Sequence, residues 1–193
     1  MKTNSLRNRL LIAAAAVITV AIAIAALGLS ALFERHVKTW IDGELDAHMT
    51  QLIAGLDRQR DGELAVIAAP TDPRFERPMS GLYWQISVDG KERDMLSRSL
   101  WDFVIALPTD AAIDEQSHHH SVAGPDGQRL YLVQRHIELA PRLNRQRARF
   151  AVAIDEAQID IAVWRFAGAL VPFLAVLGAL LIAAAWVQVS VGL

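Results

Sequence analysis

Two long stretches without a charged residue constrain this 193-residue chain more than any other feature of its sequence. They cover residues 10–33, which are 24 residues, and residues 166–193, which are 28 residues. At about 1.5 Å per helical residue they reach roughly 36 Å and 42 Å, more than the hydrocarbon core of about 30 Å. Both stretches are therefore predicted to be transmembrane helices, and a composition that is 53% hydrophobic agrees with a membrane protein.

The charged residues divide the rest of the chain into a short tail and one modest domain. Residues 1–9 carry three basic side chains and no acidic one, whereas residues 34–165 hold all 21 acidic residues and 16 of the 19 Lys and Arg. Short cytoplasmic flanks are rich in Lys and Arg, so the tail is predicted to be cytoplasmic. Residues 34–165 are then predicted to lie outside the cell, on the other side of the membrane. The net negative charge of this domain gives no sign of a nucleic-acid partner.

A cleaved signal peptide is the alternative for the first apolar stretch, since a basic tail, an apolar run and small residues are typical of such peptides. The run is longer than the about 7 to 15 residues of a usual signal core. A helical pattern also continues beyond it, with apolar residues at Val37, Ile41, Leu45, Met49, Leu52 and Leu56. We therefore expect the first span to continue as a long membrane-proximal helix that ends near Gly62.

Beyond this helix the hydrophobic period changes from about 3.6 to 2, which is typical of strands. The clearest case is Leu82–Val88, which the turn signal Asp89-Gly90 follows. Further strands are predicted at residues 64–68, 93–97, 117–122, 129–139 and 148–154. The expected fold class is α+β, with a mostly antiparallel sheet of five or six strands between two membrane helices.

The sequence contains no recognisable catalytic motif. Its 11 glycines include no G-x-G pair, so neither a dinucleotide-binding loop nor a P-loop is encoded. The motifs H-E-x-x-H and G-x-S-x-G are absent, and the chain has no cysteine. We expect no enzymatic activity, no cofactor and no disulfide within these residues.

His118, His119 and His120 form the one sequence cluster of metal-ligand type, with Asp114 and Glu115 nearby. Neutral imidazole binds Zn, Ni or Cu, and it also titrates near pH 6. Successive residues of a strand point to opposite faces, so His118 and His120 can share an ion whereas His119 cannot. The two interpretations are a metal- or proton-sensing pair at His118 and His120, and an exposed polar loop, which the pattern favours.

Two other charged groups have a membrane interpretation. Four arginines can contact anionic lipid head groups, and five acidic residues can hold a divalent cation at the membrane surface. These groups are Arg142, Arg145, Arg147 and Arg149, and Asp42, Glu44, Asp46, Asp57 and Asp61. A solvated surface is the alternative for both groups and is favoured for both. In the acidic group helical spacing splays the first three members.

Several uncharged residues also have a predicted role. Small residues, among them Gly168 and Gly178, allow the two spans to pack closely, and Pro172 predicts a bend in the second span. Three aromatic residues are candidates to line a ligand pocket, although alternation places the second of them in the core. They are Tyr83, Trp84 and Trp101.

A family resemblance rests on three runs of the sequence. They are Thr71-Asp-Pro-Arg-Phe-Glu-Arg-Pro-Met-Ser-Gly-Leu-Tyr-Trp-Gln-Ile86, Ser97-Arg-Ser-Leu-Trp-Asp102 and Ala185-Trp-Val-Gln-Val-Ser-Val-Gly-Leu193. The first two resemble the external sensor region of bacterial two-component sensor histidine kinases, of the PhoQ-like or FeuQ-like group of alphaproteobacteria, and the third resembles that group's second span. The resemblance implies a homodimer in the bacterial inner membrane, a PAS-like periplasmic sheet, and coupling of the second span to a HAMP linker and a kinase core.

The resemblance also implies parts that these residues do not include. The sequence stops where the HAMP linker would begin, before any phosphoacceptor histidine box or ATP-binding box. ATP, Mg and a cognate response regulator are expected only for that kinase core. We therefore expect the stimulus-sensing and transmembrane signalling module of a histidine kinase, as a fragment or a truncated gene product. The alternatives are a stand-alone membrane protein that binds an envelope partner or modulates another kinase, and a module that drives a cyclase or a chemoreceptor.

Overall fold

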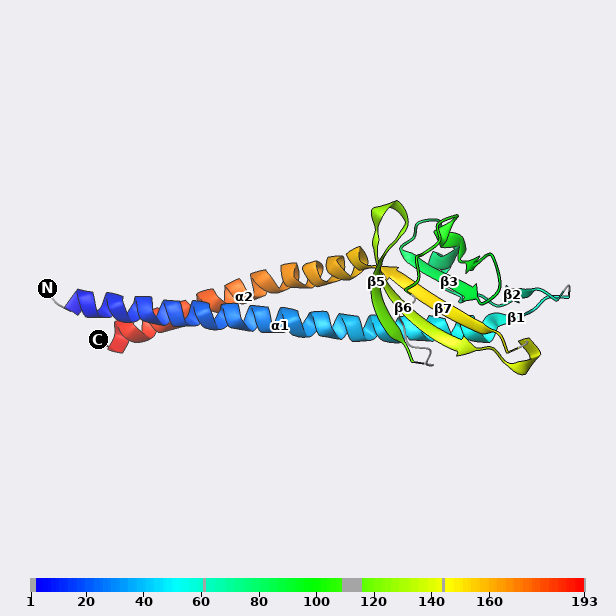
Figure 1. The fold of residues 1–193 in the computed structure, drawn as a ribbon. Helices are drawn as coiled ribbons and strands as arrows, with labels where there is room; N and C mark the ends of the chain where they lie inside the picture. The colour runs from blue at the N-terminus through cyan, green and yellow to red at the C-terminus, as the bar shows by residue number, and fades with distance from the viewer. Residues whose placement is uncertain (1–2, 61, 109–115, 144, 193) are drawn as a thin grey trace. The chain divides into compact units, whose positions relative to one another are not determined.

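A computed structural model describes residues 3–60, 62–108, 116–143 and 145–192 of the chain (Figure 1). Two long helices flank a mostly antiparallel set of strands, which confirms the α+β class. In chain order the elements are α1 (Thr3–Gly55), β1 (Leu56–Arg58), β2 (Leu64–Val66), η1 (Pro73–Glu76), β3 (Leu82–Val88), β4 (Met95–Leu96), η2 (Arg98–Leu100), β5 (His118–Ala123), η3 (Pro125–Gly127), β6 (Arg129–Glu138), η4 (Pro141–Leu143), β7 (Arg147–Asp155) and α2 (Glu156–Gly192). The chain divides into two compact units, a mixed unit at residues 38–160 and a helical unit formed by the residues on either side of it.

In the helical unit α1 and α2 are antiparallel: residues early in α1, such as Ile22, lie beside residues late in α2, such as Gly178. The rings of Phe33 and Phe166 stack with their centroids 3.9 Å apart. A Cβ atom on Gly178 would lie only 2.8 Å from Cδ1 of Ile22, so glycine permits the close approach of the two helices at this level. Near the chain ends a small cavity separates the helices, lined by Leu11, Ile12, Ala15, Ile182, Ala185 and Trp186.

Both helices are long and apolar enough to cross a membrane. Large apolar side chains are exposed along both of them, including Val17, Ile24, Leu27, Val171 and Phe173. The helix α2 continues on both sides of Pro172 as a single element. Length and composition thus make the two helices candidate membrane spans.

The mixed unit is built on a five-stranded antiparallel sheet in the order β4-β3-β7-β6-β5, with β1 and β2 as a separate hairpin (Figure 1). The central strand β7 is hydrogen-bonded to β3 on one side and to β6 on the other. All six strands predicted from the alternating pattern are present, and the strand at Leu82–Val88 has the predicted bounds.

One face of the sheet is covered by residues 38–55 of α1. Tyr131 and Arg135 on β6 hydrogen-bond to side chains of α1, and their partners in register on β7, Ile154 and Phe150, share this face. Four of the apolar residues that recur every three or four positions along α1 are buried against it, namely Ile41, Leu45, Met49 and Leu52. The predicted amphipathic helix therefore supplies the side chains that cover one face of the sheet.

The opposite face of the sheet is covered by η2 and the residues that follow it. Tyr83 and Leu132 on this face are fully buried in a cluster with Leu100 and Ile105. Gln85 fixes the covering segment, because its amide donates to the carbonyl of Ile105 at 3.1 Å and its Oε1 accepts the N–H of the same residue at 2.8 Å. Consequently every residue of β3 is buried, whereas the sequence pattern identifies only one apolar face.

The end of α1 corrects the predicted helix boundary. The helix was expected to reach Gly62, but it ends at Gly55, and Leu56–Arg58 form β1. The carbonyl of Gly55 accepts the N–H of Ile67 at 2.8 Å, and a Cβ atom at position 55 would lie 1.9 Å from the carbonyl oxygen of Ala68. A side chain at position 55 would therefore force the backbone of Ala68 to shift. The described residues therefore contain seven strands, and β1 is the one that the sequence does not predict.

Candidate functional site

Polar residues flank the buried stripe of α1 on both sides. Glu44 and His48 are one helical turn apart on one flank, and Asp42 and Asp46 are one turn apart on the other. Glu44 on the first flank binds Arg74 of η1, whereas Asp42 and Asp46 bind side chains of β6. The three acidic residues thus splay as helical spacing predicts, and they contact different parts of the domain.

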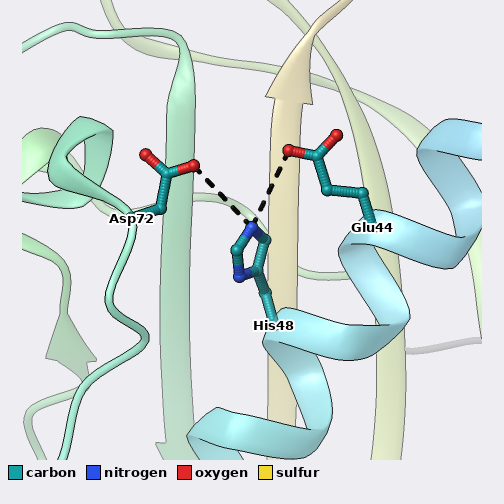
Figure 2. Close-up of side chains that lie close together, drawn as sticks. All are labelled: Glu44, His48 and Asp72. Carbon is teal, nitrogen blue, oxygen red and sulfur yellow. Dashed lines mark ion pairs between the residues drawn. The ribbon is translucent and has the colours of Figure 1, made fainter.

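Glu44, His48 and Asp72 meet between α1 and the segment that leads into η1 (Figure 2). The Nε2 atom of His48 lies 3.9 Å from Oε1 of Glu44 and 3.9 Å from Oδ2 of Asp72. One potential ligand atom from each residue lies within 4.8 Å of the other two. Across the parts of the chain that the structure describes, no other three His, Cys, Asp or Glu side chains gather in this way.

Arg74 binds both carboxylates of this cluster at once. Its Nη2 donates to Oε1 of Glu44 at 2.5 Å and to Oδ2 of Asp72 at 2.6 Å. Its Nε also donates to Asp72, at 3.1 Å to Oδ1 and 3.0 Å to Oδ2. Two carboxylates and one guanidinium leave a net negative charge beside the imidazole, so the cluster can accept further positive charge.

The backbone of η1 fixes Asp72. This residue is the N-cap of η1, where its Oδ1 accepts the N–H of Arg74 at 2.8 Å, and Pro73 occupies the first helical position, where no N–H is required. The hydrogen bonds from Arg74 hold the pKa of Asp72 below its usual value. Asp72 and then Glu44 raise the pKa of Arg74 in turn, so this ion pair is fully charged at neutral pH.

Both ring nitrogens of His48 are buried and have no hydrogen-bond partner. The side chain is only 13% exposed, and its ring packs edge to face against Phe75 with centroids 5.2 Å apart. A buried polar atom without a partner costs about 1–3 kcal/mol relative to a paired one. Unpaired nitrogens beside two carboxylates therefore mark a position where a bound cation would be stabilised.

The other flank of α1 carries a second polar group. The hydroxyl of Tyr131 donates to Oδ1 of Asp42 at 2.8 Å and lies 2.9 Å from Nδ1 of His119, whose ring stacks on the tyrosine. Burial, and then the neighbouring carboxylate, raise the pKa of Tyr131. A cavity of about 360 Å³ adjoins this group, with Glu156 and His120 in its wall. Asp42, His119 and Tyr131 bind one another, so this group joins β5 and β6 to α1.

The predicted pair His118 and His120 lies on the edge strand β5. His118 is opposite Gln134 and His120 is opposite Leu132, so the two share one face and His119 points to the other. Within the described ranges no third ligand joins the pair in a metal-binding group, and Asp114 and Glu115 lie outside those ranges. A metal- or proton-sensing role for His118 and His120 stays a prediction.

The remaining candidate groups are dispersed over the domain. Asp57 lies on β1, where its Oδ1 accepts the N–H of Arg58 at 2.9 Å, and Asp61 falls outside the described residues. Arg145 and Arg147 are exposed on and before β7, so their contact with lipid stays a prediction.

The three aromatic pocket candidates do not come together. Trp84 is 7% exposed and lies in the core, as alternation predicts. Tyr83 is its neighbour on β3 and therefore points to the opposite face of the sheet. Trp101 is 65% exposed. Tyr83 and Trp84 consequently cannot line one common pocket.

The sequence alone does not identify His48, Asp72 and Arg74 as a site. The spacing of Glu44 and His48 on a predicted helix was the available signal, because residues four apart share a helix face. Nothing in the sequence relates Asp72 to that face, since its place depends on the turn that brings η1 back to α1.

Comparisons of the chain with protein-family models, with curated proteins and with solved structures find no match.

Proposed function

We propose that this chain is the stimulus-sensing and transmembrane signalling module of a two-component sensor histidine kinase. One observation carries the proposal: the helices that begin and end the mixed unit are the same continuous helices that are apolar and long enough to cross a membrane. Residues 38–55 of α1 form part of the core, and β7 passes directly into α2. A change in the packing of this unit must therefore act on both helices.

The proposed topology places the basic amino-terminal tail in the cytoplasm and residues 34–165 in the periplasm of a bacterial inner membrane. Three basic residues in the tail support this orientation. The apolar side chains exposed along α1 and α2 support a lipid environment, because contiguous apolar surface of this extent is unfavourable in water.

The proposed signal is a change between two arrangements of the membrane helices in a homodimer. The periplasmic unit would act as a PAS-like sensor, and α2 would lead into a HAMP linker and a kinase core. That core would bind ATP and Mg and would phosphorylate a response regulator. The residues of this chain bind the stimulus and move, and they carry out no chemistry of their own.

A stand-alone membrane protein that binds an envelope partner, or modulates another kinase, is the second candidate. The exposed apolar side chain of Trp40 on α1 favours it, because an exposed tryptophan is typical of protein contacts. The two candidates differ in whether α2 drives an output when a kinase follows it.

A fusion of this chain to a HAMP linker and kinase core tests the proposal. One to seven alanines are inserted after Leu193, and each rotates the linker by about 100° about the helix axis. We expect kinase output, measured through a reporter gene, to rise and fall with a helical period. Output that is the same for every insertion would contradict a signalling role for α2.

The same fusion tests the part played by α1. Leu45→Pro removes a backbone donor from the helix at a fully buried position and should change the output of the fusion. Thr50→Ala, at an exposed position of the same helix, is the matched control and should leave the output as it was. An equal output from both variants, at equal amounts of protein in the membrane, argues against transmission through α1.

A further inference from the structure

We propose that Glu44, His48 and Asp72 form a binding site for a divalent transition-metal ion such as Zn²⁺, which competes with the side chain of Arg74. The inference goes beyond the proposed function, because it concerns binding to these residues and requires no kinase output. It rests on the donor set, on the distances between the donors, and on the unpaired nitrogens of His48.

The donor set selects the class of metal. One imidazole nitrogen and two carboxylate oxygens match the ligands of Zn²⁺, and water can complete a four-coordinate site. Mg²⁺ and Ca²⁺ take oxygen ligands almost exclusively, so an imidazole at the centre of the cluster disfavours them. Cu⁺ prefers sulfur ligands, and the chain contains no cysteine.

The distances require only a small adjustment. With metal–ligand bonds of about 2.1 Å, the ligand atoms of a tetrahedral site lie about 3.4 Å apart. Nε2 of His48 is now 3.9 Å from the nearest oxygen of Glu44 and 3.9 Å from that of Asp72. Both distances must shorten by about half an ångström, and rotations of the His48 and Glu44 side chains together can supply this contraction.

Arg74 occupies the same two oxygens that a metal would take. Its Nη2 bridges Oε1 of Glu44 and Oδ2 of Asp72, so a metal bound to these atoms must displace Nη2. Oδ1 of Asp72 can keep its hydrogen bonds to the N–H and Nε of Arg74 during this exchange. Metal binding would therefore break the link between Arg74 and α1 without removing the cap of η1.

His48 is the residue that the internal ion pair leaves without a partner. Its Nε2 is directed toward the two carboxylates (Figure 2). Its Nδ1 is also buried and unpaired, although ligating histidines usually donate from their second nitrogen to a carboxylate or carbonyl. Loss of such support typically lowers metal affinity by about 10–100-fold, so we expect reversible binding in the micromolar range.

Calorimetric titration of the full chain in lipid nanodiscs with Zn²⁺ tests the proposal. We expect one site per chain, with affinity lowered at least tenfold by His48→Gln and by Glu44→Gln. The second variant keeps an oxygen for Arg74 and so preserves the contact between α1 and η1. Arg74→Met removes the competing cation and should tighten Zn²⁺ binding at least tenfold. A large excess of Mg²⁺ should not displace the bound metal.

A double variant, His118→Ala with His120→Ala, is the control for binding at the other histidine cluster and should leave the affinity unchanged. Absence of Zn²⁺ binding by the full chain overturns the proposal, and so does binding that His48→Gln does not weaken. If Arg74→Met lowers the thermal midpoint of the apo protein, its Zn²⁺ affinity reports a change of fold as well. The affinities of Glu44→Gln and His48→Gln then decide whether these residues bind the metal. Zn²⁺ binding by a chain whose kinase fusion gives a constant output would refute the signalling function and leave the metal site in place.

Discussion

The hydroxyl of Tyr131 donates a 2.8 Å hydrogen bond to Oδ1 of Asp42 and so joins β6 to the helix α1. Burial and the carboxylate both raise the pKa of this phenol, so it stays a neutral donor over the physiological range of pH. The contact lies four residues before the next one along the same flank of α1, where Arg135 donates to Asp46. These two contacts fix the register of the helix on the sheet.

Tyr131→Phe removes this donor while keeping the ring. We expect the mixed unit to lose about 1–2 kcal/mol in free energy of unfolding, because a partly buried carboxylate loses a hydrogen bond. The measurement is urea unfolding of the chain in micelles, followed by near-UV circular dichroism. Asp42→Asn keeps an acceptor oxygen and should cost less, and an unchanged midpoint for Tyr131→Phe would show that the contact contributes nothing.

Gly55 and Gly43 provide a matched pair of glycine-to-alanine changes in one helix. At Gly55 the new methyl group would meet the backbone of Ala68, so we expect a loss of about 1–3 kcal/mol from overpacking. At Gly43 nothing lies within 4 Å, so the higher helix propensity of alanine should raise stability by up to about 1 kcal/mol. Thermal melts of the two variants should shift in opposite directions. A shift in the same direction would contradict the close approach at Gly55.

The ion pair of Asp72 and Arg74 predicts how stability depends on pH. Because Arg74 lowers the pKa of Asp72 in the folded state, the stabilisation is complete above the unfolded-state pKa of about 3.9. It is lost as the pH falls through the lower folded-state value. Asp72→Asn should therefore flatten the decline in melting temperature below about pH 4. An acid limb of unchanged slope in this variant would exclude the contribution of Asp72.

Disulfide trapping can test the pairing of α1 with α2. The chain has no cysteine, so any cross-link comes from introduced residues. Ile22→Cys combined with Gly178→Cys should form an intramolecular disulfide under mild oxidation, because a Cβ atom at 178 meets the side chain at 22. Ile24→Cys with the same partner is the control, since Ile24 is largely exposed. Protection of both thiols from maleimide labelling is the readout, and equal protection in the two pairs would contradict the helix contact.

The periodic pattern of apolar residues was sufficient to predict the helix α1 and the strand β3. The charge-free runs and the spacing of Ile41, Leu45 and Met49 predicted α1, and alternation predicted β3. The burial of Tyr83 and Gln85 was not predictable in the same way. It depends on the segment after η2, which folds over the second face of the sheet.

The candidate site was not predicted either, because it too depends on a contact between segments far apart in the sequence. The helical spacing of Glu44 and His48 gave one half of it, but Asp72 reaches the cluster only because it caps η1. The end of α1 at Gly55 likewise follows from a contact with Ala68, which lies beyond the reach of helix propensity. In both cases the interaction that fixes the structure joins two segments, whereas a periodic pattern describes only one segment at a time.

The passage of β7 into α2 has a mechanical consequence. Asp155 ends the strand and Glu156 begins the helix, so no linker separates them. The hydrogen bonds that hold β7 to both neighbours lie across the strand, so a pulling force along β7 loads them together in shear. At the other end of the domain α1 is held by side chains packed in the core, among them Ile41, Leu45 and Met49, and not by strand pairing. The two helices are thus anchored in different ways, α1 by side-chain packing and α2 by a row of backbone hydrogen bonds.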